Sequence, residues 1–203
     1  MKSAFRWMSA AALATTVIVS AAPSRAQDVS PERQAMIASI SDAGGKLIEL
    51  ATAMPEKKYA WRPAKGVRSV GEVYRHVIAA NYGLPMFAGV ALPADSPVTK
   101  ENFGKFDTMT ADKATTIAQL KTSLDWAKQA IAQMPDAELD TPIDLFGMKS
   151  TKRGALVILV NHEHEHLGQS IAYARTNAIT PPWTAREQAQ AKGAADAKAK
   201  GGK

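Results

Sequence analysis

The sequence HEHEH at residues 162–166 carries an imidazole at every second position and holds three of the four histidines of this 203-residue chain. The surrounding residues, 153–175, run too long for one β-strand, and their apolar side chains recur at helical spacing. Each residue advances about 100° around a helix, so His162 and His166 lie about 40° apart, whereas His164 lies about 200° from His162. The sequence therefore predicts a long amphipathic helix that turns His162 and His166 toward the core. His164 is then exposed, or lies behind the two inward histidines.

The fourth histidine, His76, lies on a second predicted helix. The sequence SVGE at residues 69–72 is a capping box, in which the serine and the glutamate side chains each accept a hydrogen bond from the other's backbone amide. If this helix packs against the first, His76 joins His162 and His166. Three imidazoles with an open coordination position form the catalytic type of zinc site, and helix bundles commonly hold metal sites in their cores. We therefore predict that these three histidines bind a divalent metal cation. Zinc is the first expectation, and nickel, iron, manganese or cobalt suit the same ligands.

Several side chains near these histidines could shape the site. Ala80 and Gly83 follow the ligand of the second helix on the same face. Small residues there either leave room above a metal or allow another segment to approach closely, and the sequence leaves both interpretations open. Glu72 and Glu165 are the candidate catalytic carboxylates. Together with Gln169 they are also candidates to hydrogen-bond the ligands and fix their tautomers, although capping already accounts for Glu72.

Four long helical segments account for most of the chain, and we find neither internal repeats nor a strand pattern. The connection 89–109 is rich in proline and glycine, and connections of this length often carry function or cover a site. The glycine pair 44–45 marks a kink or a close helix contact. The sequence predicts an all-α protein, a four-helix bundle with a long crossover connection, in one domain over residues 27–184. The expected helices span residues 31–54, 69–85, 110–134 and 150–178, with Thr110 or Asp112 as the N-cap of the third and with the fourth beginning near Ser150 or Thr151.

The first 26 residues have the pattern of a cleavable signal peptide. Lys2 and Arg6 form a basic start, residues 10–22 are almost all small or apolar, and Ser24 and Ala26 supply the small residues that a signal peptidase reads before a cleavage after Ala26. The apolar run is short for a membrane span, so no stable span is expected after cleavage. The chain has no cysteine and therefore no disulfide framework. We predict a periplasmic or secreted protein.

The basic charge of the chain lies at its two ends. The formal net charge is +6, and removal of Lys2, Arg6 and Arg25 with the signal peptide lowers it to +3. Residues 185–203 account for that remaining charge. They are rich in alanine, lysine, glycine and glutamine without an apolar stripe, so we predict a disordered basic tail. The body between the two ends is neutral, which argues against a nucleic-acid-binding surface.

Three other interpretations compete with a catalytic metal centre. Residues 162–166 match the zinc-protease pattern H-E-x-x-H, with Glu163 as the base, but neither the downstream third ligand nor the upstream sheet of such proteases is indicated. A bundle could also hold a metal or a small ligand without turnover. In a third interpretation, the metal only stiffens a structural dimer.

Several motifs, in order along residues 30–183, resemble those of the DinB-like protein family. Residues 54–63 resemble its loop after the first helix, and residues 67–76 resemble its second-helix motif, which ends in a metal-binding histidine. Residues 161–169 resemble its fourth-helix motif N-H-x-x-x-H-x-G-Q, and residues 173–182 resemble its C-terminal end. Leu167 stands where this motif often has a basic residue.

The resemblance implies a four-helix bundle, often a homodimer, that holds a divalent metal through His76, His162 and His166. Relatives include metal-dependent thiol transferases and isomerases that use low-molecular-weight thiols in the cytoplasm. The signal peptide sets this chain apart from those relatives. We therefore expect an exported metal-dependent hydrolase or thiol transferase with a small-molecule substrate, or alternatively a non-catalytic metal- or ligand-binding bundle.

Overall fold

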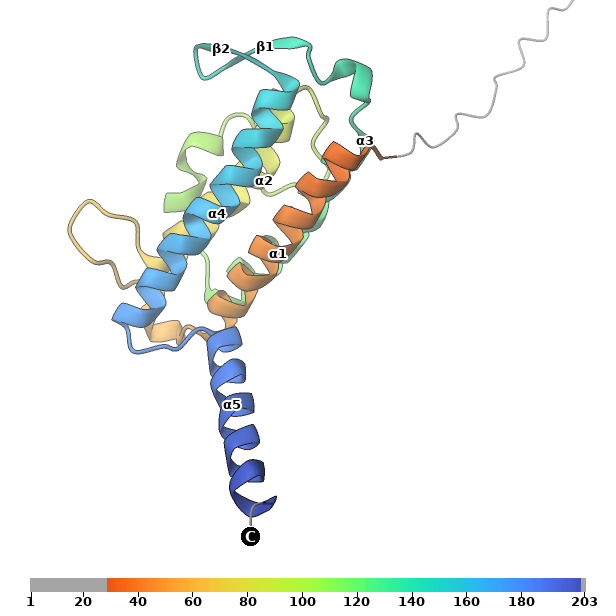
Figure 1. The fold of residues 1–203 in the computed structure, drawn as a ribbon. Helices are drawn as coiled ribbons and strands as arrows, with labels where there is room; N and C mark the ends of the chain where they lie inside the picture. Colours follow the sequence, from red (N-terminus) through yellow and green to blue (C-terminus); the bar gives the residue numbers. More distant parts are fainter. Residues whose placement is uncertain (1–28, 202–203) are drawn as a thin grey trace, which may run out of the picture.

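Four long helices form the body of the computed structural model, which describes residues 29–201. They are α1 (Pro31–Ala53), α2 (Val70–Phe87), α3 (Lys113–Gln133) and α4 (Lys152–Thr176). Helices α1 and α2 each pack against both α3 and α4 (Figure 1). Helices α1 and α2 therefore lie diagonally across the bundle from each other, as do α3 and α4, whereas the consecutive helices α2 and α3 are neighbours. The predicted all-α four-helix bundle is confirmed.

Side-chain caps set the starts of three of these helices where the sequence places them. At α2, the Ser69 hydroxyl accepts from the Glu72 amide, and the Glu72 carboxylate accepts from the Ser69 amide at 2.7 Å. Asp112 caps α3 by accepting from the Thr115 amide, and Thr151 caps α4. These bonds satisfy amides that have no partner within the first helical turn, so each cap fixes the residue at which its helix begins.

The core lies where the apolar stripes of the four helices meet. Ile40 and Leu47 of α1, Leu120 of α3 and Leu159 of α4 have no exposed surface. Gly44 of α1 lies directly against Leu124 of α3: a β-carbon built at Gly44 would come within 2.6 Å of that side chain. Of the two interpretations of the glycine pair, Gly44 therefore supports the close helix contact.

The connections contain short strands and 3₁₀ helices, and the strands were not predicted from the sequence. Between α3 and α4, strands β1 (Pro142–Leu145) and β2 (Met148–Thr151) pair as an antiparallel hairpin, where no strand was expected. Their four-residue length leaves too few positions for an apolar alternation to be recognised. The 3₁₀ helices are η1 (Glu56–Lys58), η2 (Phe103–Thr108) and η3 (Asp136–Glu138), and η2 lies within the long connection 89–109 and packs on α2.

The predicted disordered tail is instead helical. Helix α5 (Pro182–Gly201) projects away from the bundle (Figure 1), and every residue from 185 to 199 is exposed. Its first turns are anchored, because Trp183 packs against the core and Arg186 forms a bidentate ion pair with Glu49 of α1 at 2.8 and 3.1 Å. The high alanine content explains the difference, since alanine favours a helix even without an apolar stripe to bury.

Two expectations concern the membrane and the N-terminus. Among the described residues, none of the helices combines the length and the hydrophobicity needed to cross a membrane. The predicted signal peptide, residues 1–26, lies outside the described residues.

Candidate metal centre

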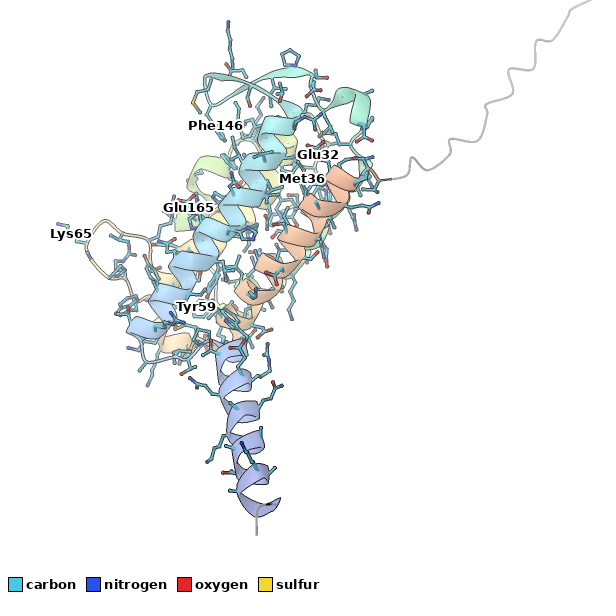
Figure 2. All side chains as sticks on the ribbon, viewed as in Figure 1. Glu32, Met36, Tyr59, Lys65, Phe146 and Glu165 are labelled. Atoms are coloured by element: carbon cyan, nitrogen blue, oxygen red, sulfur yellow. The ribbon has the colours of Figure 1, made fainter. Side chains whose placement is uncertain are left out.

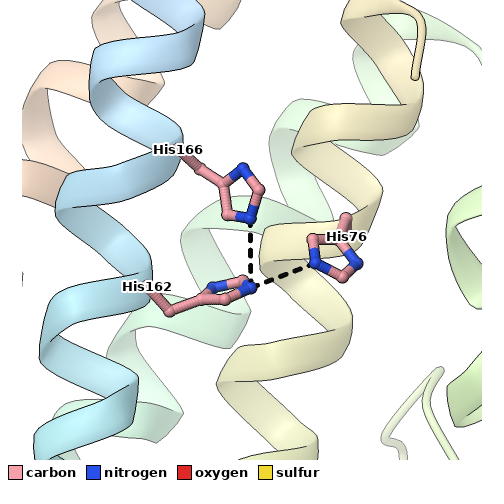
Figure 3. A group of neighbouring side chains, drawn as sticks. All are labelled: His76, His162 and His166. Carbon is pink, nitrogen blue, oxygen red and sulfur yellow. Dashed lines mark hydrogen bonds between the residues drawn. The ribbon is translucent and has the colours of Figure 1, made fainter. Parts of the chain in front are cut away.

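The three predicted ligands meet between α2 and α4 (Figure 3). The Nε2 atom of His162 lies 3.1 Å from Nε2 of His76 and 3.1 Å from Nε2 of His166. One ring nitrogen from each residue lies within 4.8 Å of the other two, an arrangement that could hold a metal ion. His164 is exposed, and its Nδ1 donates to the carbonyl of Val160 at 2.9 Å. The structure thus agrees with the prediction from helical spacing: His162 and His166 face His76, and His164 is exposed.

The surroundings of the three histidines favour neutral imidazoles. Burial, with a contribution from Arg68, lowers the pKa of His76 to about 4. Burial and the neighbouring His166 lower the pKa of His162 to about 3. Burial also lowers the pKa of His166. A neutral imidazole has a free lone pair on one nitrogen, so the group is in its metal-binding form at neutral pH.

A chain of hydrogen bonds fixes the tautomer of His166. The Tyr173 hydroxyl donates to the Arg68 carbonyl at 3.0 Å, so it accepts from Nε2 of Gln169 at 3.0 Å. Gln169 must then turn its carbonyl oxygen to His166 Nδ1, which lies 2.8 Å away. Because that oxygen only accepts, the proton of His166 is on Nδ1 and the lone pair is on Nε2, which faces the other two histidines. Gln169 thus hydrogen-bonds the nitrogen of His166 that faces away from the other two histidines, as the sequence analysis suggested it could.

Asp107 of η2 is the residue that the sequence analysis missed. Its Oδ2 lies 2.7 Å from Nε of Arg68 and 3.8 Å from Nδ1 of His76, and its backbone carbonyl accepts from Arg75 at 2.9 Å. Only the length of the connection 89–109 indicated that this segment covers a site. Nothing in the sequence distinguished Asp107 from the other acids of the chain.

The two candidate catalytic carboxylates lie elsewhere. Glu72 caps its own helix and pairs with Arg62 at 2.8 Å, which lowers its pKa despite partial burial. Glu165 is exposed on α4 (Figure 2). Neither residue lines the pocket that opens beside the histidines.

Glu163 does not have the position of a protease base. Its side chain is fully buried, and neither carboxylate oxygen accepts a hydrogen bond of good geometry. Burial raises its pKa to about 8, while the side chain of Asn81 acts in the opposite direction. Because Glu163 faces the core and not the pocket, the match to H-E-x-x-H does not correspond to a protease site.

A pocket of about 370 Å³ opens beside the histidines and gives a small molecule access to them. His76 and His162 form part of its wall, and Asp107 is the one carboxylate in its lining. Ala80 also lines the pocket, so its small side chain does leave room beside the site. Gly83 does not: a β-carbon there would come within 2.1 Å of the Phe103 ring. Ala80 therefore fits the first interpretation, room beside a metal, whereas Gly83 fits the second, the close approach of another segment.

This donor set suits a divalent cation. Three neutral imidazole nitrogens converge, one of them is held in the correct tautomer, and one side is open to a pocket. Imidazole nitrogens suit zinc, nickel, iron and cobalt alike, so the ligands do not identify the metal.

Comparisons with known proteins agree on the fold. The curated protein named Uncharacterized protein YjoA, of Bacillus subtilis, is 28% identical over 131 residues, which make up 63% of this chain and 79% of YjoA. A DinB-like protein from Bacillus cereus superposes with a TM-score of 0.62 at 18% identity, over 73% of this chain and 95% of that one. YfiT from Bacillus subtilis superposes with a TM-score of 0.58 at 17% identity, over 76% and 93%. YfiT is described as a probable metal-dependent hydrolase with an unusual four-helix bundle topology. At these identities the structures establish the fold alone.

The family model of the DinB superfamily matches residues 40–170, a span that includes His76, His162 and His166. This span is more than half of the chain and contains most of the four-helix bundle. The chain therefore belongs to the DinB superfamily.

Proposed function

We propose that this protein is a metal-dependent hydrolase of a small molecule, with His76, His162 and His166 as the metal ligands. The observation that carries the proposal is the convergence of three neutral imidazole nitrogens beside an open pocket. A binding site that only stiffened the bundle would not need this access. The description of YfiT as a probable metal-dependent hydrolase supports the same reaction class.

The chemistry divides between the cation and the side chains around it. A divalent cation with an open coordination position polarises a substrate oxygen and lowers the pKa of a water molecule. The side chains have three tasks. Gln169 holds His166 in the tautomer that presents Nε2, Asp107 lies on the Nδ1 side of His76 and favours the tautomer that presents Nε2 of that ligand, and Arg68 holds the Asp107 carboxylate in place.

The pocket favours hydrolysis over thiol transfer. A charged low-molecular-weight thiol would need charged partners beside the metal, and Asp107 is the one charged side chain in the lining, since the histidines are neutral. Because Arg68 already pairs with that carboxylate, the lining offers a charged thiol no free partner, whereas water requires no binding groups of its own.

The test combines metal analysis with turnover. We expect the purified protein to hold one equivalent of metal, and His76→Ala and His162→Ala each to lose it. His164→Ala is the matched control, because replacing this exposed histidine should leave the metal content unchanged.

Metal-loaded protein should hydrolyse members of a panel of small esters and amides, and Asp107→Asn should lower kcat with the metal retained. Metal retained by His76→Ala would overturn the ligand set, and a metal-loaded protein without hydrolysis, or active only with added thiols, would overturn the reaction.

Export and dimerisation rest on the sequence. We propose that residues 1–26 direct export and are cleaved, and that the mature chain forms a homodimer. N-terminal sequencing of the protein from a periplasmic fraction should begin at Gln27. Light scattering should give twice the mass of one chain. A cytoplasmic protein with an intact N-terminus would contradict export.

A further inference from the structure

The pocket beside the three histidines has an almost entirely apolar wall. Asp107, His76 and His162 are its charged or polar side chains, and they lie together at the metal end. Polar substrates such as sugars or small amino acids would leave their hydroxyl or amino groups without partners against such a wall, which is costly. The pocket therefore favours an apolar group. The remaining side chains of the wall are Ala79, Ala80, Leu84, Phe103, Phe146 and Ile158.

Phe146 reaches this wall from the β1–β2 hairpin, at the end of the bundle where the hairpin lies (Figure 2). Its backbone is left-handed, with φ of 57°, and the following Gly147 has φ of 83°. Glycine, asparagine and aspartate fit such a tight turn, whereas a bulky side chain is strained there. A strained residue is retained only where its surroundings hold it, and such residues gather at functional sites. The turn thus holds an aromatic ring in a place that its backbone does not favour.

Two other rings hold Phe146 against the pocket. Its ring stacks on Phe103 of η2, at 6.0 Å between centroids and 10° between planes, and meets Phe87 of α2 edge-on at 5.0 Å. Phe103 in turn occupies the space that the missing side chain of Gly83 leaves open. Nevertheless, 55% of Phe146 is exposed, so part of the ring remains free to contact a bound molecule.

We infer that the substrate carries an aromatic or bulky aliphatic group next to the bond that is hydrolysed, and that Phe146 and Phe103 bind this group. The inference rests on the proposed function as far as the reaction is concerned. The preference for an apolar group depends only on the residues that line the pocket. The reacting bond lies at the histidine end, and the apolar group extends toward the hairpin. Phe146 is then a specificity-determining residue.

Two zinc-binding probes test the inference, because they differ only in the apolar group. Benzohydroxamate and acetohydroxamate are titrated calorimetrically into zinc-loaded protein. We expect benzohydroxamate to bind at least about tenfold more tightly, since burial of a ring contributes that much or more. Phe146→Asn should reduce this ratio at least about threefold and leave the affinity for acetohydroxamate unchanged. Asparagine tolerates the left-handed turn, so this variant should fold as well as the wild type.

Met148→Asn is the matched control. Met148 lies in the same hairpin, is 62% exposed and does not line the pocket, so the ratio should stay at the wild-type value. Equal affinities of the two hydroxamates in the wild type would overturn the inference. An unchanged ratio in Phe146→Asn would do the same, and a change of oligomeric state alone in that variant would assign Phe146 to a subunit interface instead.

Metal-free protein separates this inference from the proposed function. Benzyl alcohol, which needs no metal, should produce saturable shifts in the methyl resonances of Leu84 and Ile158, with weaker binding in Phe146→Asn. If zinc does not bind, the proposed function fails and this titration alone decides. Absence of a saturable shift would then overturn the apolar pocket.

Discussion

Gln169 determines which nitrogen of His166 is free to bind a metal. Its carbonyl oxygen accepts from Nδ1 of His166, and its amide donates to Tyr173. Gln169→Leu removes that acceptor, so His166 can carry its proton on either nitrogen and can rotate. We expect the metal affinity to fall about 10- to 100-fold, as is typical for loss of such a supporting group. Competition with a chromophoric chelator measures the change.

Gln169→Glu is the informative companion to this variant. A carboxylate still accepts from Nδ1 of His166, so the affinity should stay much closer to that of the wild type than in Gln169→Leu. Equal affinities of wild type and Gln169→Leu would show that the tautomer is fixed by something other than this chain of hydrogen bonds.

The residues of the centre were predictable to different degrees. Helical spacing fixes the relation of His162 to His166, and the capping box fixes the position of His76 in its helix, so the sequence indicated all three. Asp107 depends on the path of an irregular connection, which Arg75 and Arg68 hold through its carbonyl and its carboxylate. Such a path has no periodicity, so the sequence did not locate Asp107 relative to His76.

The two glycines of α1 differ in their surroundings although they are neighbours. Gly44 is buried against Leu124 of α3, whereas Gly45 is exposed and a β-carbon there would meet nothing within 4 Å. Gly44→Ala should therefore lower the free energy of unfolding by about 1–3 kcal/mol through overpacking. Gly45→Ala should raise it by up to about 1 kcal/mol, because alanine is the better helix former. Urea unfolding of both variants beside the wild type measures the difference.

Each glycine variant is the control for the other, since both make the same change in the same helix. Two destabilised variants would indicate that α1 needs flexibility at this pair. Two stabilised variants would show that Leu124 moves aside without cost and that the close contact is not required.

At the level of elements, caps made the helices predictable and the hairpin was missed. Asp112 is one of the two N-caps that the sequence offered for α3, and Thr151, which caps α4, is one of the two residues near which the sequence placed the start of that helix. In β1, Leu145 is the one buried residue, so burial leaves almost no pattern in four positions. The turn has Phe146 before Gly147 in place of asparagine, the residue by which such a turn is usually recognised. The phenylalanine that made the hairpin hard to recognise in the sequence is also the residue that lines the pocket.

For the whole molecule, four amphipathic segments were enough to predict a bundle but not its arrangement. That α1 lies across from α2, and α3 across from α4, follows from the connections and their contacts and not from the stripes. The connection through η2 joins the neighbouring helices α2 and α3 and packs along α2, back toward the start of that helix. It thereby brings Asp107 over α2, so the topology itself supplies the carboxylate that the helices lack.

Helix α5 should contribute to stability only through its first turns. Residues 185–199 are exposed, while Trp183 packs on the core and Arg186 pairs with Glu49. Deletion of residues 188–203 should leave the thermal midpoint unchanged within about 1 °C, because it removes no buried surface. Deletion of residues 182–203 should lower it by roughly 2–6 °C, mainly through loss of the tryptophan, since an exposed ion pair contributes little.

Circular dichroism at 222 nm measures both midpoints, and the far-ultraviolet signal before unfolding reports the helix lost in each deletion. Trp183→Ala in the full-length chain is the matched control. It should reproduce most of the loss seen when residues 182–203 are deleted and leave the distal helix in place. If deletion of residues 188–203 lowered the midpoint by several degrees, the distal helix would have to pack on another surface, such as a second copy of the chain. The midpoint would then depend on protein concentration, which a dilution series detects.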